Sequence, residues 1–161
     1  MFSLGFAIAI IAAGLAAGMS ASGASIGVGL AGEMASGVLS EDPDKIGSVL
    51  VLQALPGTQA FYGLVTAILV LVKLQLFSGS PLTTISIEQG LSVLGACLPV
   101  ILGEFVSAIW QGRVSVTAMG TVAKRPDAFG KAVILPAMVE TFALLSLIGS
   151  IVILMVGIKL A

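Results

Sequence analysis

Histidine is absent from this chain, which has one cysteine, one tryptophan and one tyrosine, and only 9% of its residues are charged. The lone Cys97 excludes an internal disulfide and, without histidine, leaves no cysteine–histidine zinc site, so we expect a buried packing residue. No lysine or arginine precedes Lys45, so the first segment lacks the basic start of a signal peptide and is predicted to be a retained helix. The net charge of -1 gives no sign of a nucleic-acid partner.

Apolar residues dominate what remains. They make up 58% of the 161 residues, and the mean hydropathy is +1.17, which is typical of an integral membrane protein. Each of four apolar stretches exceeds the ~20 residues that cross a bilayer as a helix. We therefore predict an all-α membrane protein with four transmembrane helices, at about residues 2–39, 47–77, 90–123 and 127–160.

The connections between these stretches are short. Four crossings then place both termini on the same side of the membrane. Lys45, Arg113, Lys124, Arg125 and Lys131 lie at or near the first and third loops, against Lys73 and Lys159 on the other side. The positive-inside rule therefore predicts a multi-pass protein of the cell membrane, with loops 40–45 and 124–127 cytoplasmic and both termini outside.

An internal repeat divides the chain into two helical hairpins, residues 1–80 and 81–161. A shift of 83 residues aligns Pro43 with Pro126 and Thr58 with Thr141, and several glycines align as well. Because two crossings separate equivalent points, both hairpins have the same orientation in the membrane. The same shift aligns Gly57 with Glu140, so only the second hairpin carries the acid discussed next.

Glu140 is that acid, and no other charged residue occurs from Ala132 to Ile158. A carboxylate in hydrocarbon costs roughly 3 kcal/mol or more, so an intramembrane acid indicates an ion or proton path. If Pro43 and Pro126 mark the cytoplasmic turns, then Thr58, Gln111 and Glu140 all lie about 21 to 23 Å from that side. We therefore expect these three residues in one layer.

The second predicted helix presents Leu55, Thr58, Gln59 and Tyr62 on a single face. Pro56 interrupts the backbone ladder beside them, which is expected to free carbonyl oxygens. A hard cation prefers several such oxygens. The pattern favours a cation site over the alternative, in which these polar residues only hydrogen-bond the helices together.

The first helix is rich in small residues. Gly14 and Gly18, and again Gly23 and Gly27, have the spacing that lets helix backbones approach closely in lipid. The contact could lie within a four-helix bundle. So many consecutive small residues favour instead the crowded inner layer of a ring of identical subunits.

Three segments, Leu55–Gly63, Trp110–Gly112 and Met138–Thr141, resemble the duplicated proteolipid of the V-type ATPase rotor ring, and in particular its sodium-dependent bacterial form, subunit K. The resemblance spans the whole chain. It implies a non-catalytic rotor subunit, turned by ATP hydrolysis in a separate soluble sector through a central stalk, with a stator membrane subunit that supplies an arginine. The implied sodium site consists of the Leu55 carbonyl, Thr58, Gln59, Gln111 and Glu140, with the Tyr62 hydroxyl holding the carboxylate.

Alternatives to this interpretation are a rotor that carries protons and, less favoured, a small four-helix channel or transporter. A proton site needs only the carboxylate and a partner, so the additional oxygens favour sodium. Glu104 is a second acid that the resemblance does not explain. It lies two turns from Gln111, about 10 Å nearer the outer side, and is predicted to be protonated and inert, to face a water-filled ring lumen, or to belong to an ion route.

Overall fold

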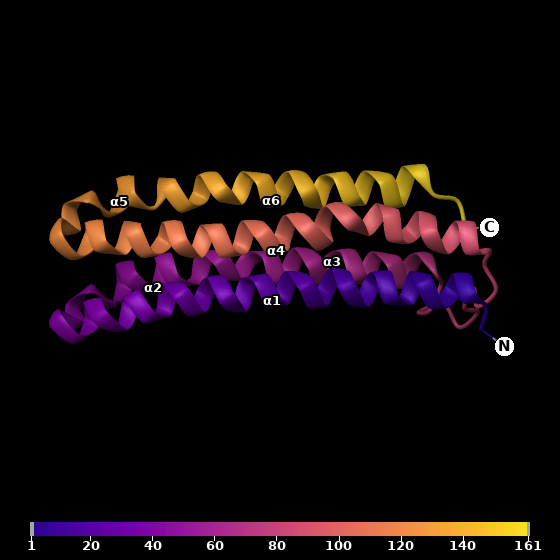
Figure 1. The fold of residues 1–161 in the computed structure, drawn as a ribbon, viewed down its shortest axis with the longest axis horizontal. Helices are drawn as coiled ribbons and strands as arrows, with labels where there is room; N and C mark the ends of the chain where they lie inside the picture. Colours follow the sequence, from indigo (N-terminus) through magenta and orange to yellow (C-terminus); the bar gives the residue numbers. More distant parts are fainter. Residues whose placement is uncertain (1, 161) are drawn as a thin grey trace.

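The computed structural model describes residues 2–160, which form helices and turns without any strand (Figure 1). The α-helices are α1 (Leu4–Glu41), α2 (Ile46–Ala54), α3 (Thr58–Lys73), α4 (Ile87–Lys124), α5 (Phe129–Ala132) and α6 (Ile134–Val152). A 3₁₀ turn at Leu55–Gly57 joins α2 to α3, and a π-turn at Ile153–Gly157 extends α6. Four continuous helical segments are long and apolar enough to cross a membrane, namely Leu4–Glu41, Pro43–Lys73, Ile87–Lys124 and Pro126–Gly157. The all-α class and the four spans are thereby confirmed.

The second and fourth spans end earlier than predicted. The second helix ends at Lys73 rather than at residue 77, because Gln75 adopts a left-handed φ of 57°. Leu74 is nevertheless buried, and its carbonyl accepts a hydrogen bond of 2.9 Å from the Leu82 amide. The fourth span ends at Gly157 instead of residue 160. Hydropathy alone missed both ends, since apolar side chains continue beyond the last helical turn.

Proline begins both tight turns at one end of the bundle. Pro43 and Pro126 are the first residues of short 3₁₀ turns directly after α1 and α4, where a missing amide hydrogen costs nothing. At the other end, Ser86 caps α4 through a reciprocal pair of hydrogen bonds with Gln89. The two proline turns lie together at the left of Figure 1, and the labelled chain ends lie at the right.

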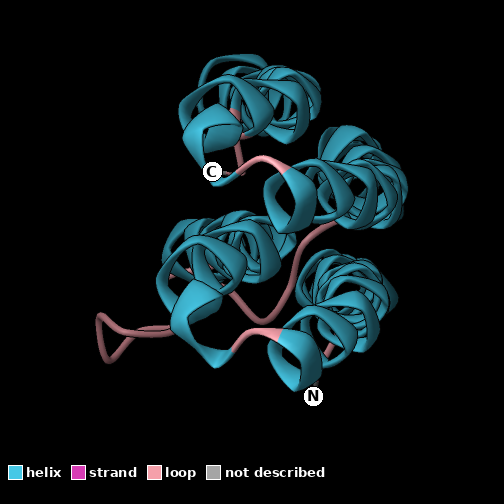
Figure 2. Ribbon diagram, turned by 90° about the vertical axis from the view of Figure 1, so that its left-hand side faces the viewer, coloured by secondary structure: helices cyan, strands magenta, loops and turns pink. Residues whose placement is uncertain are grey.

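The four rods run side by side as two hairpins (Figure 1), and the end-on view shows how they are layered (Figure 2). Helices α1 and α4 lie against each other. The α2–α3 rod packs beside them, and α6 packs on α4. Polar residues that lie at one height on α3, α4 and α6 can therefore meet.

Glycines set the approach of α1 and α4. A Cβ atom added to Gly112 would lie 2.5 Å from the Gly27 Cα, and one added to Gly90 would lie 2.8 Å from the Gly5 Cα. Gly23 likewise faces the Phe105 backbone, whereas a Cβ atom on Gly14 or Gly18 would meet nothing within 4 Å. Among residues 2–160, therefore, only the second of the two predicted glycine pairs is part of the packing within one chain. Cys97 is fully buried, which confirms its predicted packing role.

Candidate ion-binding site

Glu140 on α6 is half-buried and accepts hydrogen bonds from three residues of α3 and one of α4. Tyr62 Oη donates to Glu140 Oε1 at 2.5 Å, and Thr58 Oγ1 lies 2.9 Å from both carboxylate oxygens. Gln111 Nε2 and Gln59 Nε2 lie 2.8 and 3.3 Å from Oε2. The carboxylate therefore ties α6 to both neighbouring helices.

Thr58 Oγ1 is surrounded by oxygen atoms. Besides the two carboxylate oxygens, the Leu55 carbonyl oxygen lies 2.9 Å away and the Gln59 Oε1 atom 3.3 Å away. A hydroxyl group has a single hydrogen, so it donates well to only one of these acceptors at a time. The oxygen-rich neighbourhood is the kind of donor set that a hard cation prefers.

The two glutamines are fully buried and hydrogen-bonded to each other. Gln59 Nε2 donates to Gln111 Oε1 at 2.6 Å, and Gln111 Nε2 donates to the Pro136 carbonyl at 3.1 Å. Gln111 thus presents its amide nitrogen to Glu140, whereas a direct ligand of a cation would present its amide oxygen. Its oxygen is already engaged by Gln59, and a carboxylate attracts donors rather than acceptors.

Two prolines shape the backbone at this level. Pro56 lacks an amide hydrogen and its ring crowds the preceding turn, and the chain there forms the 3₁₀ turn Leu55–Gly57 between α2 and α3. Pro136 lies one turn before Glu140, close after the break between α5 and α6 at Val133. The sequence identified Pro56, whereas it missed the Pro136 carbonyl as a partner of Gln111. The spacing could have indicated this partner, because Pro136 precedes Glu140 by about one helical turn and so lies near it in space.

Charge at the site comes from one carboxylate. No three aspartate, glutamate, cysteine or histidine side chains within residues 2–160 come together as a metal cluster would require. One carboxylate is neutralised by one monovalent cation or one proton. The remaining oxygens, from Leu55, Thr58 and Gln59, carry no net charge.

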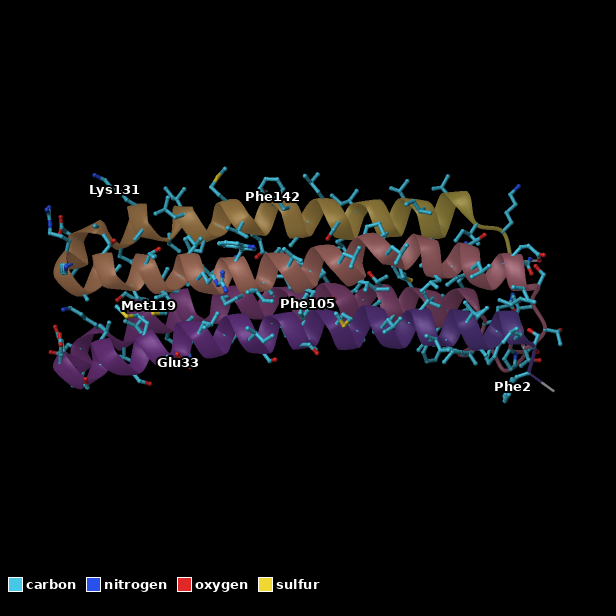
Figure 3. All side chains as sticks on the ribbon, viewed as in Figure 1. Phe2, Glu33, Phe105, Met119, Lys131 and Phe142 are labelled. Carbon is cyan, nitrogen blue, oxygen red and sulfur yellow. The ribbon has the colours of Figure 1, made fainter. Side chains whose placement is uncertain are left out.

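Large apolar side chains are exposed on the two helices, α3 and α6, that carry Tyr62 and Glu140. Phe61, Met138 and Phe142 are 67%, 59% and 68% exposed, and Phe142 points away from the bundle in Figure 3. Trp110 is also exposed, with the Arg113 guanidinium 4.9 Å above its ring. The outer faces of these helices are therefore suited to contact with lipid or with another apolar protein.

Glu104 lies apart from this cluster. It is fully buried between α4 and α6, where Ser146 Oγ lies 2.7 Å from Glu104 Oε1 and Oε2 has no hydrogen-bond partner. The prediction that Glu104 faces a water-filled lumen is therefore wrong. Sequence reasoning missed Ser146, because the spacing along one helix does not show which residue of another helix faces it.

Fold and site together define a multi-pass α-helical membrane protein with one half-buried acid among neutral polar groups. The sequence matches the model of the ATP synthase C-subunit family twice, over residues 11–70 and over residues 94–153. The two matched segments are offset by 83 residues, the same offset as the internal repeat. The chain belongs to the ATP synthase C-subunit family.

Two relatives are similar over most of this chain. V-type sodium ATPase subunit K of Enterococcus hirae is 38% identical over 146 residues, which cover 91% of this chain and 89% of that protein. A-type ATP synthase subunit K of Methanocaldococcus jannaschii is 36% identical over 144 residues, covering 89% of this chain and 60% of that protein. The chain is thus a rotor proteolipid of a V- or A-type ATPase, which translocates ions and is not itself the catalyst.

Proposed function

We propose that this chain is the membrane rotor subunit of a V-type rotary ATPase and that it carries sodium ions through a site centred on Glu140. The ligands are the Leu55 carbonyl, Thr58, Gln59 and Glu140, with Gln111 and Tyr62 supporting the carboxylate. Identical subunits form a ring in the membrane, and ATP hydrolysis in the soluble sector turns the ring through a central stalk.

The observation that carries the proposal is that Thr58 Oγ1 has more acceptor oxygens around it than its one hydroxyl hydrogen can serve. The Thr58 Oγ1 atom lies 2.9 to 3.3 Å from the Leu55 carbonyl oxygen, the Gln59 amide oxygen and both Glu140 oxygens. A cation among these oxygens satisfies all of them together, and a single hydrogen does not. Three of the groups come from consecutive turns of one rod, because the 3₁₀ turn at Pro56 brings the Leu55 carbonyl beside Thr58.

Sodium is favoured over a proton by the donors on the other side of Glu140. Tyr62 donates to Oε1 and Gln111 donates to Oε2, so a proton on either oxygen would meet a hydrogen that is already directed at that oxygen. An ionised carboxylate needs a cation as its neutralising partner in the membrane. The name of the relative from Enterococcus hirae, a sodium ATPase subunit, supports the same ion.

Charge neutralisation then couples ion binding to rotation. A bare carboxylate is expensive in lipid, so Glu140 passes through the bilayer only with its ion bound. At the stator, an arginine competes for Glu140 and releases the ion. The exposed apolar side chains of Phe61 on α3 and of Met138 and Phe142 on α6 suit sliding contact with both lipid and stator.

The same proposal fixes an orientation. Loops 40–45 and 124–127, which contain the proline turns, face the cytoplasm and the central stalk, and both termini lie outside. The two hairpins, residues 1–80 and 81–161, lie parallel, and only the second carries the ion-binding acid.

Transport by the reconstituted complex tests this function. The assembled ATPase in proteoliposomes is expected to take up radioactive sodium when ATP is supplied, and Glu140→Gln is expected to abolish uptake. Glu88→Gln is the matched control, because Glu88 is an exposed acid at the start of α4. ATP-driven uptake that persists in Glu140→Gln would refute the site, and uptake of protons without any effect of sodium would reassign the ion.

A further inference from the structure

The second buried acid, Glu104, has no role in the sodium site. It is fully buried in α4, and the ion pairs within residues 2–160, Lys45–Asp42 and Arg125–Asp127, both lie near the proline turns. Arg113, the next base on α4, is nine residues away, or about 14 Å along the helix. An ionised carboxylate buried without a counter-charge is strongly destabilising. Glu104 is therefore neutral.

Counting hydrogens at Ser146 locates the neutralising proton. The Ser146 Oγ atom lies 2.7 Å from Glu104 Oε1 and 2.8 Å from the Ala143 carbonyl oxygen. Its single hydrogen serves only one of these acceptors. With a proton on Oε1, Glu104 donates to Ser146 Oγ and Ser146 donates to Ala143, so both short contacts are hydrogen bonds. The unpartnered Oε2 atom is then the carbonyl oxygen of a neutral acid, which is less costly to bury than half of a charged group.

The close approach of α4 and α6 fixes this arrangement. A Cβ atom on Gly103 would lie 2.5 Å from the Ser146 Cβ and 2.6 Å from its Oγ. The repeat places Ser20 and Gly63 at the equivalent positions of the first hairpin, where they also touch and where the Ser20 hydroxyl bonds only to the Ala16 carbonyl. The residue equivalent to Glu104 is alanine, at position 21. The acid is thus an addition of the second hairpin to a contact that both hairpins share.

The titratable neighbours of Glu104 come from three helices. Tyr62 on α3 and Glu140 on α6 lie close enough to act on it electrostatically, and Cys97 is two turns away on α4 itself. Helix α1 has no titratable side chain before Glu33. None of these groups supplies a positive charge.

We propose that Glu104 is a second proton-binding site, which keeps its proton between Oε1 and Ser146 Oγ while Glu140 binds and releases its ion. Glu140 is then the one acid of each chain whose charge changes within the bilayer during rotation. The proton at Glu104 stays bound while the rotor turns and is not exchanged with the solvent at each step. The geometry at Glu104 does not depend on which ion Glu140 carries, whereas the test below rests on the proposed sodium site, which leaves Glu140 without a proton.

Infrared absorption of the purified ring tests the proposal. Near neutral pH and in saturating sodium, the wild type is expected to show the C=O stretching band of a protonated carboxylic acid. The band should vanish in Glu104→Gln and remain in Glu140→Gln, which separates the two acids. In Ser146→Ala the band should remain and move to higher wavenumber, because the hydrogen bond from the acid is lost.

The inference is overturned if the wild type lacks a protonated-acid band under these conditions, or if Glu104→Gln leaves the band intact. If Glu104→Gln does not assemble, the Ser146→Ala ring decides the question, since an unshifted band would contradict the proposed hydrogen bond. A sodium-insensitive band lost only in Glu140→Gln would likewise contradict the inference, and it would count against the sodium site as well.

Discussion

The Tyr62 hydroxyl donates a 2.5 Å hydrogen bond to Glu140 Oε1, joining α3 to the acid on α6. This bond leaves Oε2 to Gln111 and Gln59 and directs the carboxylate toward Thr58. Tyr62 is the only tyrosine in the chain, so its removal changes one well-defined contact. In the proposed sodium site, this bond holds the carboxylate in place.

Tyr62→Phe is therefore expected to weaken sodium binding while leaving transport intact. A hydrogen bond to a charged group contributes about 1.5 kcal/mol or more, so the half-saturating sodium concentration should rise roughly tenfold. The measurement is sodium-stimulated ATPase activity of the assembled complex over a range of sodium concentrations. Phe61→Leu, which alters the neighbouring exposed ring, is the control and should change the value little. An unchanged sodium requirement in Tyr62→Phe would mean that the bond has no part in binding.

Thr58→Val tests the oxygen cluster itself. Valine has nearly the shape of threonine and removes only the hydroxyl, which lies within 2.9 Å of Leu55 O and of both Glu140 oxygens. We expect roughly a tenfold loss of sodium affinity or more, with proton binding to Glu140 retained. Equilibrium binding of radioactive sodium to the purified ring measures this loss.

Thr117→Val is the matched control for Thr58→Val. The Thr117 hydroxyl also bonds to a carbonyl of its own helix, that of Val114, but on an exposed face of α4. This variant should bind sodium as the wild type does. Equal losses in both variants would show that the threonine hydroxyls act through helix stability and not as ligands.

Gly112→Ala is expected to destabilise the chain through the α1–α4 contact. The added methyl group would lie 2.5 Å from the Gly27 Cα atom, and overpacking of this kind costs roughly 1 to 3 kcal/mol. The ring should dissociate at a lower temperature in detergent, as followed by electrophoresis. Gly149→Ala is the control, because a methyl group there meets nothing within 4 Å. A Gly112→Ala ring as heat-stable as the control would contradict the packing.

The sequence was sufficient to bring Thr58, Gln111 and Glu140 to one depth, because helical rise is constant and Pro43 and Pro126 mark the turns. It did not show how the side chains meet. The amide orientation of Gln111 depends on Gln59 and on the Pro136 carbonyl, which belong to other helices. The pairing of Glu104 with Ser146 likewise depends on the rotation of α6 against α4, and the helix end at Lys73 depends on one backbone angle.

Modification of Glu140 by a hydrophobic carbodiimide tests the central claim most directly, since the reagent attacks the protonated acid and a bound cation blocks it. At a fixed pH, sodium should protect Glu140 in the wild-type ring, and potassium at the same ionic strength should not. The modified residue is identified by mass spectrometry of the isolated chain. Equal modification in sodium and potassium, with protection only by raising the pH, would show that Glu140 carries protons and would contradict the sodium site.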